Sequence, residues 1–249
     1  LFKDRNDLVE YFQFLSASKI SKIELIGNKI DIGDVFSVID QMNTDIPLYK
    51  INLSKNDCVN FTGRYKLPIT LNKLILARVR WTTNSLISLL SQQQFTNKIA
   101  LDLSFLQGNI NDLHASFPKT QMNKFSEIKW NMNTISAEFF VFLRNFAELR
   151  SLSLNDCTCE PAKLPEITNA MVFFVQTSKL RELQFRSSPQ SPHPEIVNGL
   201  FSVIRAHQTI DTIDISYNDI GDNGIQNFVK SLEGGNQISR IAFDGSNVN

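Results

Sequence analysis

The chain has 249 residues, with 25 Lys and Arg against 25 Asp and Glu, so its formal charge at neutral pH is zero. A chain without a global field does not recruit nucleic acid by charge, and we expect no nucleic-acid partner. No run approaches the ~18 uninterrupted apolar residues that a membrane span needs.

One apolar spacing, L-x-x-L-x-L-x-x-N-x-L with Ile, Phe or Trp often in place of Leu, occurs nine times, at intervals of 23 to 31 residues between the middle anchors. A spacing repeated at this period is the signature of leucine-rich repeats. The nine middle anchors are Ile23, Ile51, Leu74, Leu101, Ile128, Leu152, Leu183, Ile213 and Ile241.

The elements follow from this spacing in chain order. Residues 8–15 have the apolar face of a helix, and each x-L-x-L-x run predicts a short strand with one buried face. Residues 60–68 (NFTGRYKLP) predict a loop or a single turn in place of a helix. Later helices are predicted over Ser136–Ala147, Pro165–Ser178, Pro194–Gln208 and Asp222–Gly234, with Pro165 and Pro194 at helix starts and Gly234 and Gly235 at a stop.

The copies differ in quality. Those from Ile20, Leu48 and Ile210 are nearly ideal, whereas the copies around Leu101 and Leu183 are the weakest. No repeat can bury its apolar face alone, so neighbours must stack into a continuous core. The sequence therefore predicts an α/β leucine-rich-repeat solenoid (horseshoe), with short parallel strands on the concave face and helices on the convex face. We expect residues 1–249 to form a single domain of about nine repeats. Since neither end carries a polar capping unit, we expect an excerpt of a longer array.

Asn occupies one column of four copies, where its amide can satisfy backbone groups in the turn after the strand. These residues are Asn28, Asn56, Asn133 and Asn218, and Cys157 is a small polar substitute in the same column. Cys58 and Cys159 occupy the final apolar column, so packing explains all three cysteines. Since the Cys-rich caps usual in extracellular repeats are missing, a reducing, cytoplasmic setting is expected.

The sequence contains no Gly-rich phosphate loop, no H-E-x-x-H and no G-x-S-x-G. The repeat geometry also predicts no Cys/His pair on a shared surface, and His114, His193 and His207 fall in unrelated repeats. We therefore expect no enzyme activity, no cofactor and no catalytic or metal-binding residue.

The predicted concave face carries the candidate partner-binding residues. Lys22, Lys50 and Lys73 share one column of consecutive repeats, either as a basic ladder for an acidic partner segment or as an ordinary solvated face. The concave candidates are Lys22, Lys50, Lys73, Asp102, Lys129, Arg186, Asp214 and Arg240. Phe105, Met132 and Tyr217 follow the strands at equivalent positions and are either exposed anchors of an interface or buried core residues.

The order of long and short repeats from Leu71 to Asn249 resembles the leucine-rich-repeat domain of the CARMIL family of actin regulators. The resemblance is carried by LNKLILARVRW with TTNSLISLLSQ, IALDLSFLQGNINDL, FSEIKWNMNTISAEFFVFLRNFAELRSLSLNDC, LRELQF and TIDTIDISYNDIGDNGIQNFVKSLEGGNQISRIAF. It implies a cytoplasmic scaffold that links capping protein and myosin I in actin assembly. It also implies a full-length homodimer and membrane contact only through modules outside this chain.

Two other interpretations remain open. One is an unrelated intracellular recognition module, such as a sensor or a ligase adaptor. The other is a Ran-type GTPase-activating protein, although the acidic tail of that family is missing here. The weak fourth and seventh copies, and Val79, Leu106 and Ser188 in the Asn column, depart from any consensus.

Overall fold

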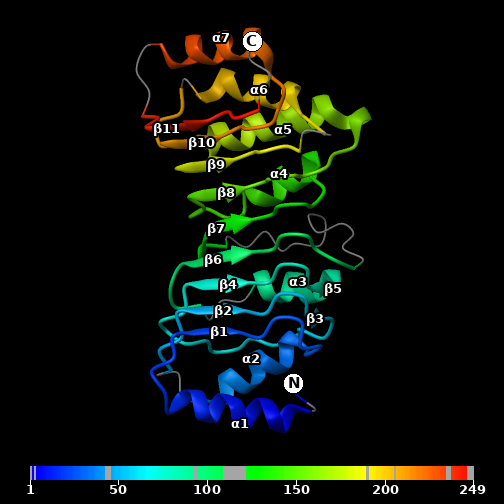
Figure 1. Ribbon diagram of the computed structural model, residues 1–249, viewed down its shortest axis with the longest axis vertical. Coiled ribbons are helices and arrows are strands. Elements are labelled where there is room, and N and C mark those ends of the chain that lie inside the picture. The colour runs from blue at the N-terminus through cyan, green and yellow to red at the C-terminus, as the bar shows by residue number, and fades with distance from the viewer. Residues whose placement is uncertain are drawn as a thin grey trace. The chain divides into compact units, whose positions relative to one another are not determined.

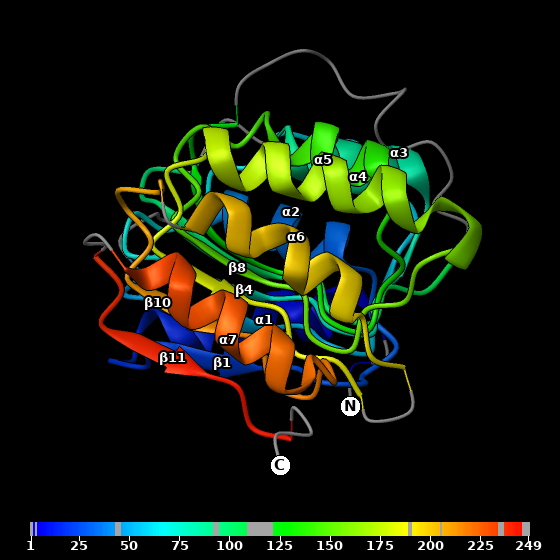
Figure 2. The same ribbon diagram turned by 90° about the horizontal axis from the view of Figure 1, so that it is seen from above.

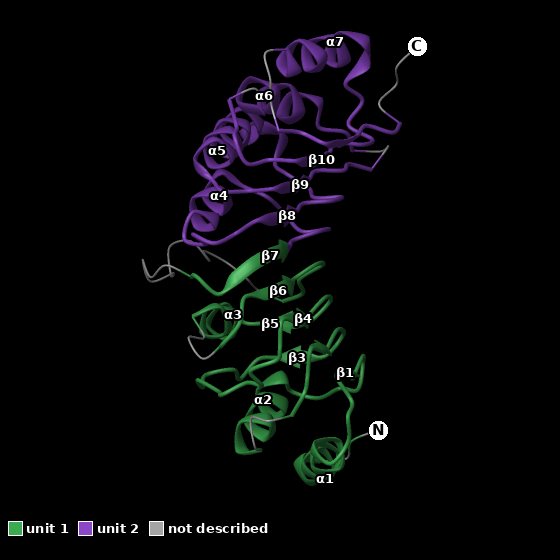
Figure 3. Ribbon diagram, turned by 90° about the vertical axis from the view of Figure 1, so that its left-hand side faces the viewer, with its two compact units in different colours: residues 1–128 green, residues 129–249 purple. Residues whose placement is uncertain are grey.

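The computed structural model describes residue 2 and residues 4–42, 46–91, 95–108, 122–188, 191–204, 206–233 and 237–245. The chain divides into two compact units, Leu1–Ile128 and Lys129–Asn249, which are coloured separately in Figure 3. In the described residues, nine strands of the main sheet correspond one by one to the nine predicted copies.

Unit 1 begins with a helix and then alternates strands with helices or loops (Figure 1). Its strands follow one another in the order β1-β2-β4-β6-β7. The parallel register aligns Ile23 with Ile51, Ile51 with Leu74, and Leu74 with Leu101, so the predicted anchors form one row. The elements are α1 (Arg5–Ser16), β1 (Lys22–Glu24), α2 (Ile32–Gln41), β2 (Lys50–Asn52), β3 (Asp57–Cys58), β4 (Lys73–Ile75), β5 (Arg80–Trp81), α3 (Thr83–Leu90), β6 (Ile99–Asp102) and β7 (Phe125–Lys129), whose last residue begins unit 2.

Unit 2 continues the pattern with longer helices. Its strands follow the order β8-β9-β10-β11, again parallel where Leu152, Leu183, Ile213 and Ile241 align. Helices α4 to α7 pack successively against one another, and Figure 2 shows α5, α6 and α7 in one layer. The elements are α4 (Ala137–Leu143), β8 (Ser151–Ser153), η1 (Pro161–Lys163), α5 (Leu164–Thr177), β9 (Glu182–Gln184), α6 (Pro194–Ile204), β10 (Thr212–Asp214), α7 (Gly221–Leu232) and β11 (Arg240–Ala242).

The core of each unit lies between the strands and the helix layer. Ile51 and Leu74 in unit 1, and Leu183 and Ile213 in unit 2, are completely buried. Burying a side chain of this size stabilises the fold by about 1.5–3 kcal/mol relative to leaving it exposed. Most phenylalanines fill the space behind the strands. The wholly buried ones are Phe12, Phe36, Phe61, Phe95, Phe125, Phe140, Phe185 and Phe228.

The predicted helices are found, with shifted ends. Helix α1 buries Leu8, Phe12 and Leu15, and Asp4 caps it by accepting from two backbone N–H groups. Helix α7 ends at Leu232, and the predicted stop at Gly234 and Gly235 lies outside the described residues.

The prediction for residues 136–147 is too long, because α4 ends at Leu143. Ser136 caps its start, with its hydroxyl accepting from the Phe139 N–H at 3.2 Å. At the other end, the Asn145 amide donates to the Phe142 carbonyl at 2.9 Å, and this side chain satisfies an end carbonyl that a further turn would have used.

Residues 60–68 contain no helix, as predicted. The Phe61 and Tyr65 rings lie edge to face at 5.2 Å between centroids, and Phe61 meets Phe36 of α2 at 5.4 Å. This aromatic cluster fills the volume that a helix occupies elsewhere, since such rings bury large apolar areas. No helix in the described part of the chain has the combined length and apolarity for crossing a bilayer.

Candidate protein-binding surfaces

The open side of the main sheet, here called the strand face, consists of the residues that alternate with the buried anchors. In unit 1 the register pairs Lys22 with Lys50 and Lys50 with Lys73, so the predicted lysine column exists. Its middle member is not free, because the Lys50 ammonium forms an ion pair with Glu24 at 2.8 Å. The hydrogen bond and charge of Lys50 lower the pKa of Glu24. Lys22 is exposed and Lys73 is half-buried.

Carboxylates of the strand face cap the backbone that follows them. Asp102 accepts from the Ser104 N–H at 3.0 Å, and Asp214 accepts from the Ser216 N–H at 3.1 Å. Asn52 does the same for Ser54 at 3.1 Å. This local side-chain bond is typical of Asp and Asn at the end of an element. Both predicted contact carboxylates, Asp102 and Asp214, therefore have a structural role at their strand ends.

In unit 2 the strand face is a connected network of hydroxyl, amide and carboxylate groups. The Ser153 hydroxyl lies 2.8 Å from the side-chain amide oxygen of Asn131 and 3.1 Å from that of Gln184. The Gln184 amide donates to Glu182 at 2.6 Å, and the Asn155 amide donates to Gln184 at 3.3 Å. The polar groups of this surface satisfy one another, which makes it stiff and leaves fewer donors for a partner.

The remaining charged candidates of unit 2 do not form a cluster. Arg186 is exposed and forms an ion pair with Asp214 at 3.6 Å. Arg240 is exposed on β11, and Lys129 is half-buried at the end of β7. The structure therefore gives these cations separate surroundings, unlike the aligned lysines of unit 1.

The fourth residue after each anchor adopts a left-handed backbone in eight of the nine copies. Its N–H donates to the next repeat, as in Lys55 to Ala77 at 3.0 Å and Met132 to Asn155 at 2.8 Å. A positive φ costs a non-glycine residue roughly 1–2 kcal/mol, yet only two of the eight are glycine. The residues and φ values are Gly27 (67°), Lys55 (60°), Arg78 (57°), Phe105 (55°), Met132 (58°), Asp156 (54°), Tyr217 (63°) and Gly245 (62°).

The three candidate interface residues, Phe105, Met132 and Tyr217, all belong to this left-handed column. Phe105 is 40% exposed and Met132 is 50% exposed, so neither is a core residue. Tyr217 is half-buried. The Arg78 guanidinium lies 5.1 Å from the Phe105 ring centroid, and Arg186 lies 5.5 Å from that of Tyr217. An arginine thus stacks on the exposed Phe105 in unit 1 and on the half-buried Tyr217 in unit 2.

The asparagine column works as predicted. The buried Asn56 amide donates to Leu25 of the preceding repeat at 2.6 Å and to Leu53 of its own repeat at 2.9 Å. Asn218 repeats this geometry with Phe185 and Ile215 at 2.6 and 2.9 Å.

Cys157 makes the bond to the preceding repeat in place of an asparagine, because its thiol donates to the Trp130 carbonyl at 3.3 Å. Burial raises the pKa of Cys157 to about 12, so the group stays a neutral donor at physiological pH. The column therefore links neighbouring repeats through buried carbonyl groups that would otherwise lack a partner.

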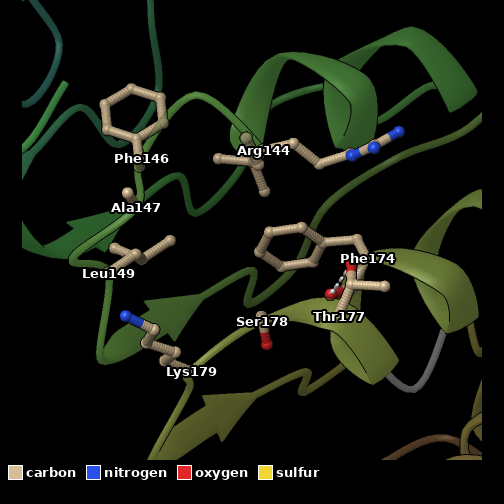
Figure 4. A pocket seen from close by; sticks show the side chains of 9 residues that line it. Arg144, Phe146, Ala147, Leu149, Phe174, Thr177, Ser178 and Lys179 are labelled. Atoms are coloured by element: carbon tan, nitrogen blue, oxygen red, sulfur yellow. Dashed lines mark hydrogen bonds between the residues drawn. The ribbon is translucent and has the colours of Figure 1, made fainter. Parts of the chain in front are cut away.

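A separate pocket of about 290 Å³ lies where the short helix α4 ends beside the longer α5. Leu143, Phe146, Leu149 and Phe174 form its apolar lining. Figure 4 shows the Phe174 ring pointing into this space, with Arg144 and Lys179 on opposite sides. No sequence signal predicts this pocket, because it depends on α4 ending at Leu143 and not at the predicted Ala147.

One prediction about chemistry is wrong. We expected no Cys/His pair on a shared surface, but Cys159 and His193 lie together with 3.8 Å between Sγ and Nδ1, and His193 Nε2 is 3.2 Å from the Cys157 carbonyl. The long connection after β9 brings His193 back to the preceding repeat. Burial raises the pKa of Cys159, which disfavours a nucleophilic thiolate. Within the described residues, no group of three or more His, Cys, Asp or Glu side chains could hold a metal ion. His114 lies outside them.

The aligned anchors, the buried asparagine column and the helix layer behind an open strand face define an α/β leucine-rich-repeat fold. No protein-family model matches the chain, and no curated protein matches it either. Among solved structures, the chain is similar to an internalin (InlF) from Listeria monocytogenes str. 4b F2365. The identity is 10% and the TM-score 0.32, over 98% of this chain and 84% of that chain.

Proposed function

We propose that the chain is a non-catalytic recognition module that binds a partner protein through its strand face. The observation that carries this proposal is the row of Lys22, Lys50 and Lys73, which parallel register places side by side on an open surface. Neighbouring strands lie about 4.8 Å apart, so like charges in adjacent positions repel one another. A partner with acidic groups would relieve that repulsion, and Lys22 and Lys73 would supply the contacts because Lys50 is paired with Glu24.

We further propose that this module serves a regulator of actin assembly. The support is the resemblance of the runs between Leu71 and Asn249 to the CARMIL repeat domain. In that interpretation the partners are capping protein and myosin I, and the repeats act as a scaffold in the cytoplasm. A full-length homodimer and attachment to membranes through other modules belong to the same proposal.

Two experiments separate the general proposal from the specific one. For the specific one, the full-length native protein is immunopurified and its complexes are quantified by mass spectrometry. Enrichment of capping-protein subunits or myosin I is expected, and repeated absence of both would contradict the actin assignment.

For the general one, the same purification is repeated with Lys22→Glu/Lys73→Glu, in parallel with Lys19→Glu/Lys230→Glu. Both doubles reverse two charges, and the second pair lies on exposed positions outside the strand face. We expect the strand-face double to lose about tenfold of its bound partner, since each reversal removes a contact worth up to about 1 kcal/mol. Equal recovery with the two doubles would contradict a strand-face partner.

A further inference from the structure

A second charged surface lies in unit 1, at the edge where the strands turn back toward the helices. It is a groove of about 500 Å³, and we call it the basic groove. The fourth and sixth residues after the anchors of consecutive repeats supply its charged side chains. Its charged lining residues are Lys29, Lys55, Asp57, Arg78 and Arg80.

The groove has an excess of positive charge that its own carboxylate does not cancel. Asp57 forms an ion pair with Arg80 at 3.0 Å. The nearby carboxylate of Asp31 caps α2, where it accepts from the Gly33 N–H at 2.7 Å. In the described part of the chain, Lys29, Lys55 and Arg78 form no ion pair. Three cations therefore face one open groove.

The backbone of the turns is held in place at the three residues that carry these cations. Lys29, Lys55 and Arg78 all have a left-handed backbone, with φ of 58°, 60° and 57°. The N–H groups of Lys55 and Arg78 are bound to Ala77 and Ser104 at 3.0 and 2.9 Å. The Arg78 guanidinium is also stacked on Phe105 at 5.1 Å. Since the backbone and one of the head groups are already held, a partner pays less entropy to order them.

The equivalent edge of unit 2 is different, so the groove is not a general consequence of the repeat. There the fourth residues after the anchors include Asp156, Ser187 and Tyr217, which line a space of about 430 Å³ with Arg186. Arg186 is already engaged by Asp214 at 3.6 Å. A partner selected by negative charge would thus bind the turns of unit 1 and not those of unit 2.

We propose that the basic groove binds an extended acidic peptide segment of a partner protein. This inference rests on the proposed function, and it adds the partner's chemistry and a second surface. Repeats lie about 4.8 Å apart, so three consecutive turns span about 10 Å, the length of about three extended residues. Asp or Glu side chains of such a segment lie over Lys29, Lys55 and Arg78, and an apolar neighbour packs on the exposed face of Phe105.

The test uses the full chain and a fluorescent 12-residue peptide of alternating Glu and Ala, with binding measured by anisotropy at low salt. The groove double Lys55→Gln/Arg78→Gln is compared with Lys19→Gln/Lys230→Gln, which removes the same charge from exposed positions elsewhere. Gln, like Lys and Arg, carries a Cβ, so the left-handed turns keep their steric demand. We expect the groove double to bind about tenfold more weakly and the control to stay within about twofold of wild type.

Each outcome decides the proposal. Equal binding by the groove double and wild type overturns it, as does a wild-type chain that binds no acidic peptide. If Lys22→Gln/Lys73→Gln abolishes binding while the groove double does not, the strand face is the acidic site and the groove is not. A single-stranded oligonucleotide that displaces the peptide at lower concentration than unlabelled peptide also overturns a peptide site. None of these outcomes changes the strand-face purification result, so the two proposals fail separately.

Discussion

Unit 1 carries lysine in one strand-face column of three consecutive repeats, where three consecutive repeats of unit 2 carry Ser151, Glu182 and Thr212 and the next carries Arg240. On the strand face, Lys22, Lys50 and Lys73 of unit 1 are aligned, whereas Ser153 and Gln184 of unit 2 bond to each other. Both units use the same buried anchors, so the open positions vary without changing the fold. The comparison teaches that in a repeat fold the buried columns determine architecture, while the open columns are available for recognition.

The largest expected effect comes from placing a charge in an anchor column. Ile213→Asp puts an unpaired carboxylate at a completely buried apolar position, and we expect it to cost unit 2 about 4–5 kcal/mol. Ile51→Asp should do the same in unit 1. The chain has two tryptophans, Trp81 in unit 1 and Trp130 in unit 2, so single-Trp variants report each unit during urea unfolding.

The control for this pair is Ile26→Asp, since Ile26 is 43% exposed on the strand face. It should change stability by less than about 0.5 kcal/mol. If Ile213→Asp were equally mild, the register of unit 2 would be wrong.

The asparagine column should show the next largest effect. Asn218→Ala leaves the buried carbonyls of Phe185 and Ile215 without their donor and should destabilise unit 2 by about 3 kcal/mol. Asn56→Ala should cost unit 1 a similar amount. Cys157→Ala removes only one weak donor and should cost about 1 kcal/mol. Urea midpoints read by the tryptophan of each unit give the comparison, and equal losses for Asn218 and Cys157 would refute the assigned bonds.

The left-handed column predicts small gains in stability. Replacing Lys55 in unit 1 or Asp156 in unit 2 by Gly should stabilise the corresponding unit by about 0.5–1 kcal/mol, because glycine adopts positive φ without a steric cost. The matched change Gly27→Ala should destabilise unit 1 by a similar amount. Calorimetric melting of the three variants tests this, and a lower melting temperature for both glycine variants would show that φ is not positive there.

The smallest effect concerns acid and belongs to unit 2. The buried His207 accepts from the Ile210 N–H at 3.2 Å through Nδ1, and its Nε2 lies 2.9 Å from the Val175 carbonyl. Burial lowers the pKa of His207, so its neutral form is favoured in the folded state. The resulting stability is present above the unfolded pKa of about 6.5 and is lost as pH falls through the lower folded value.

Lowering the pH from 7.5 to 5 should therefore reduce the free energy of unfolding of unit 2 more than that of unit 1, whose described residues include no histidine. Urea unfolding at each pH measures the two values. His207→Gln should reduce that difference. A pH dependence that is equal in the two units, or unaffected by the substitution, would contradict the assignment.

The sequence predicted the strands and the core because each anchor is apolar and its neighbours are not. Ile23, Ile51 and Leu74 are aligned as their spacing requires, and Asn56 and Asn218 bond as their column predicts. Buried positions accept few residue types, so the residue type found at such a position predicts its place in the fold.

The left-handed column and the basic groove could not be predicted from the residue types in this way. Only Gly27 and Gly245 show the residue type that positive φ favours, while Lys, Arg, Phe, Met, Asp and Tyr occupy the other six positions. The charged side chains of the groove stand at the fourth and sixth positions after the anchors, in turns that lie outside the strand alternation, so the strand pattern does not place Lys55 beside Arg78.

The difference between the units can be tested directly with the ¹⁵N-labelled full chain and the acidic peptide of alternating Glu and Ala. We predict that backbone amide shifts move in the turns of unit 1, at Lys29, Lys55 and Arg78, and stay in place at Asp156, Ser187 and Tyr217 of unit 2. Shifts confined to the turns of unit 2, or spread evenly over both units, would contradict the account.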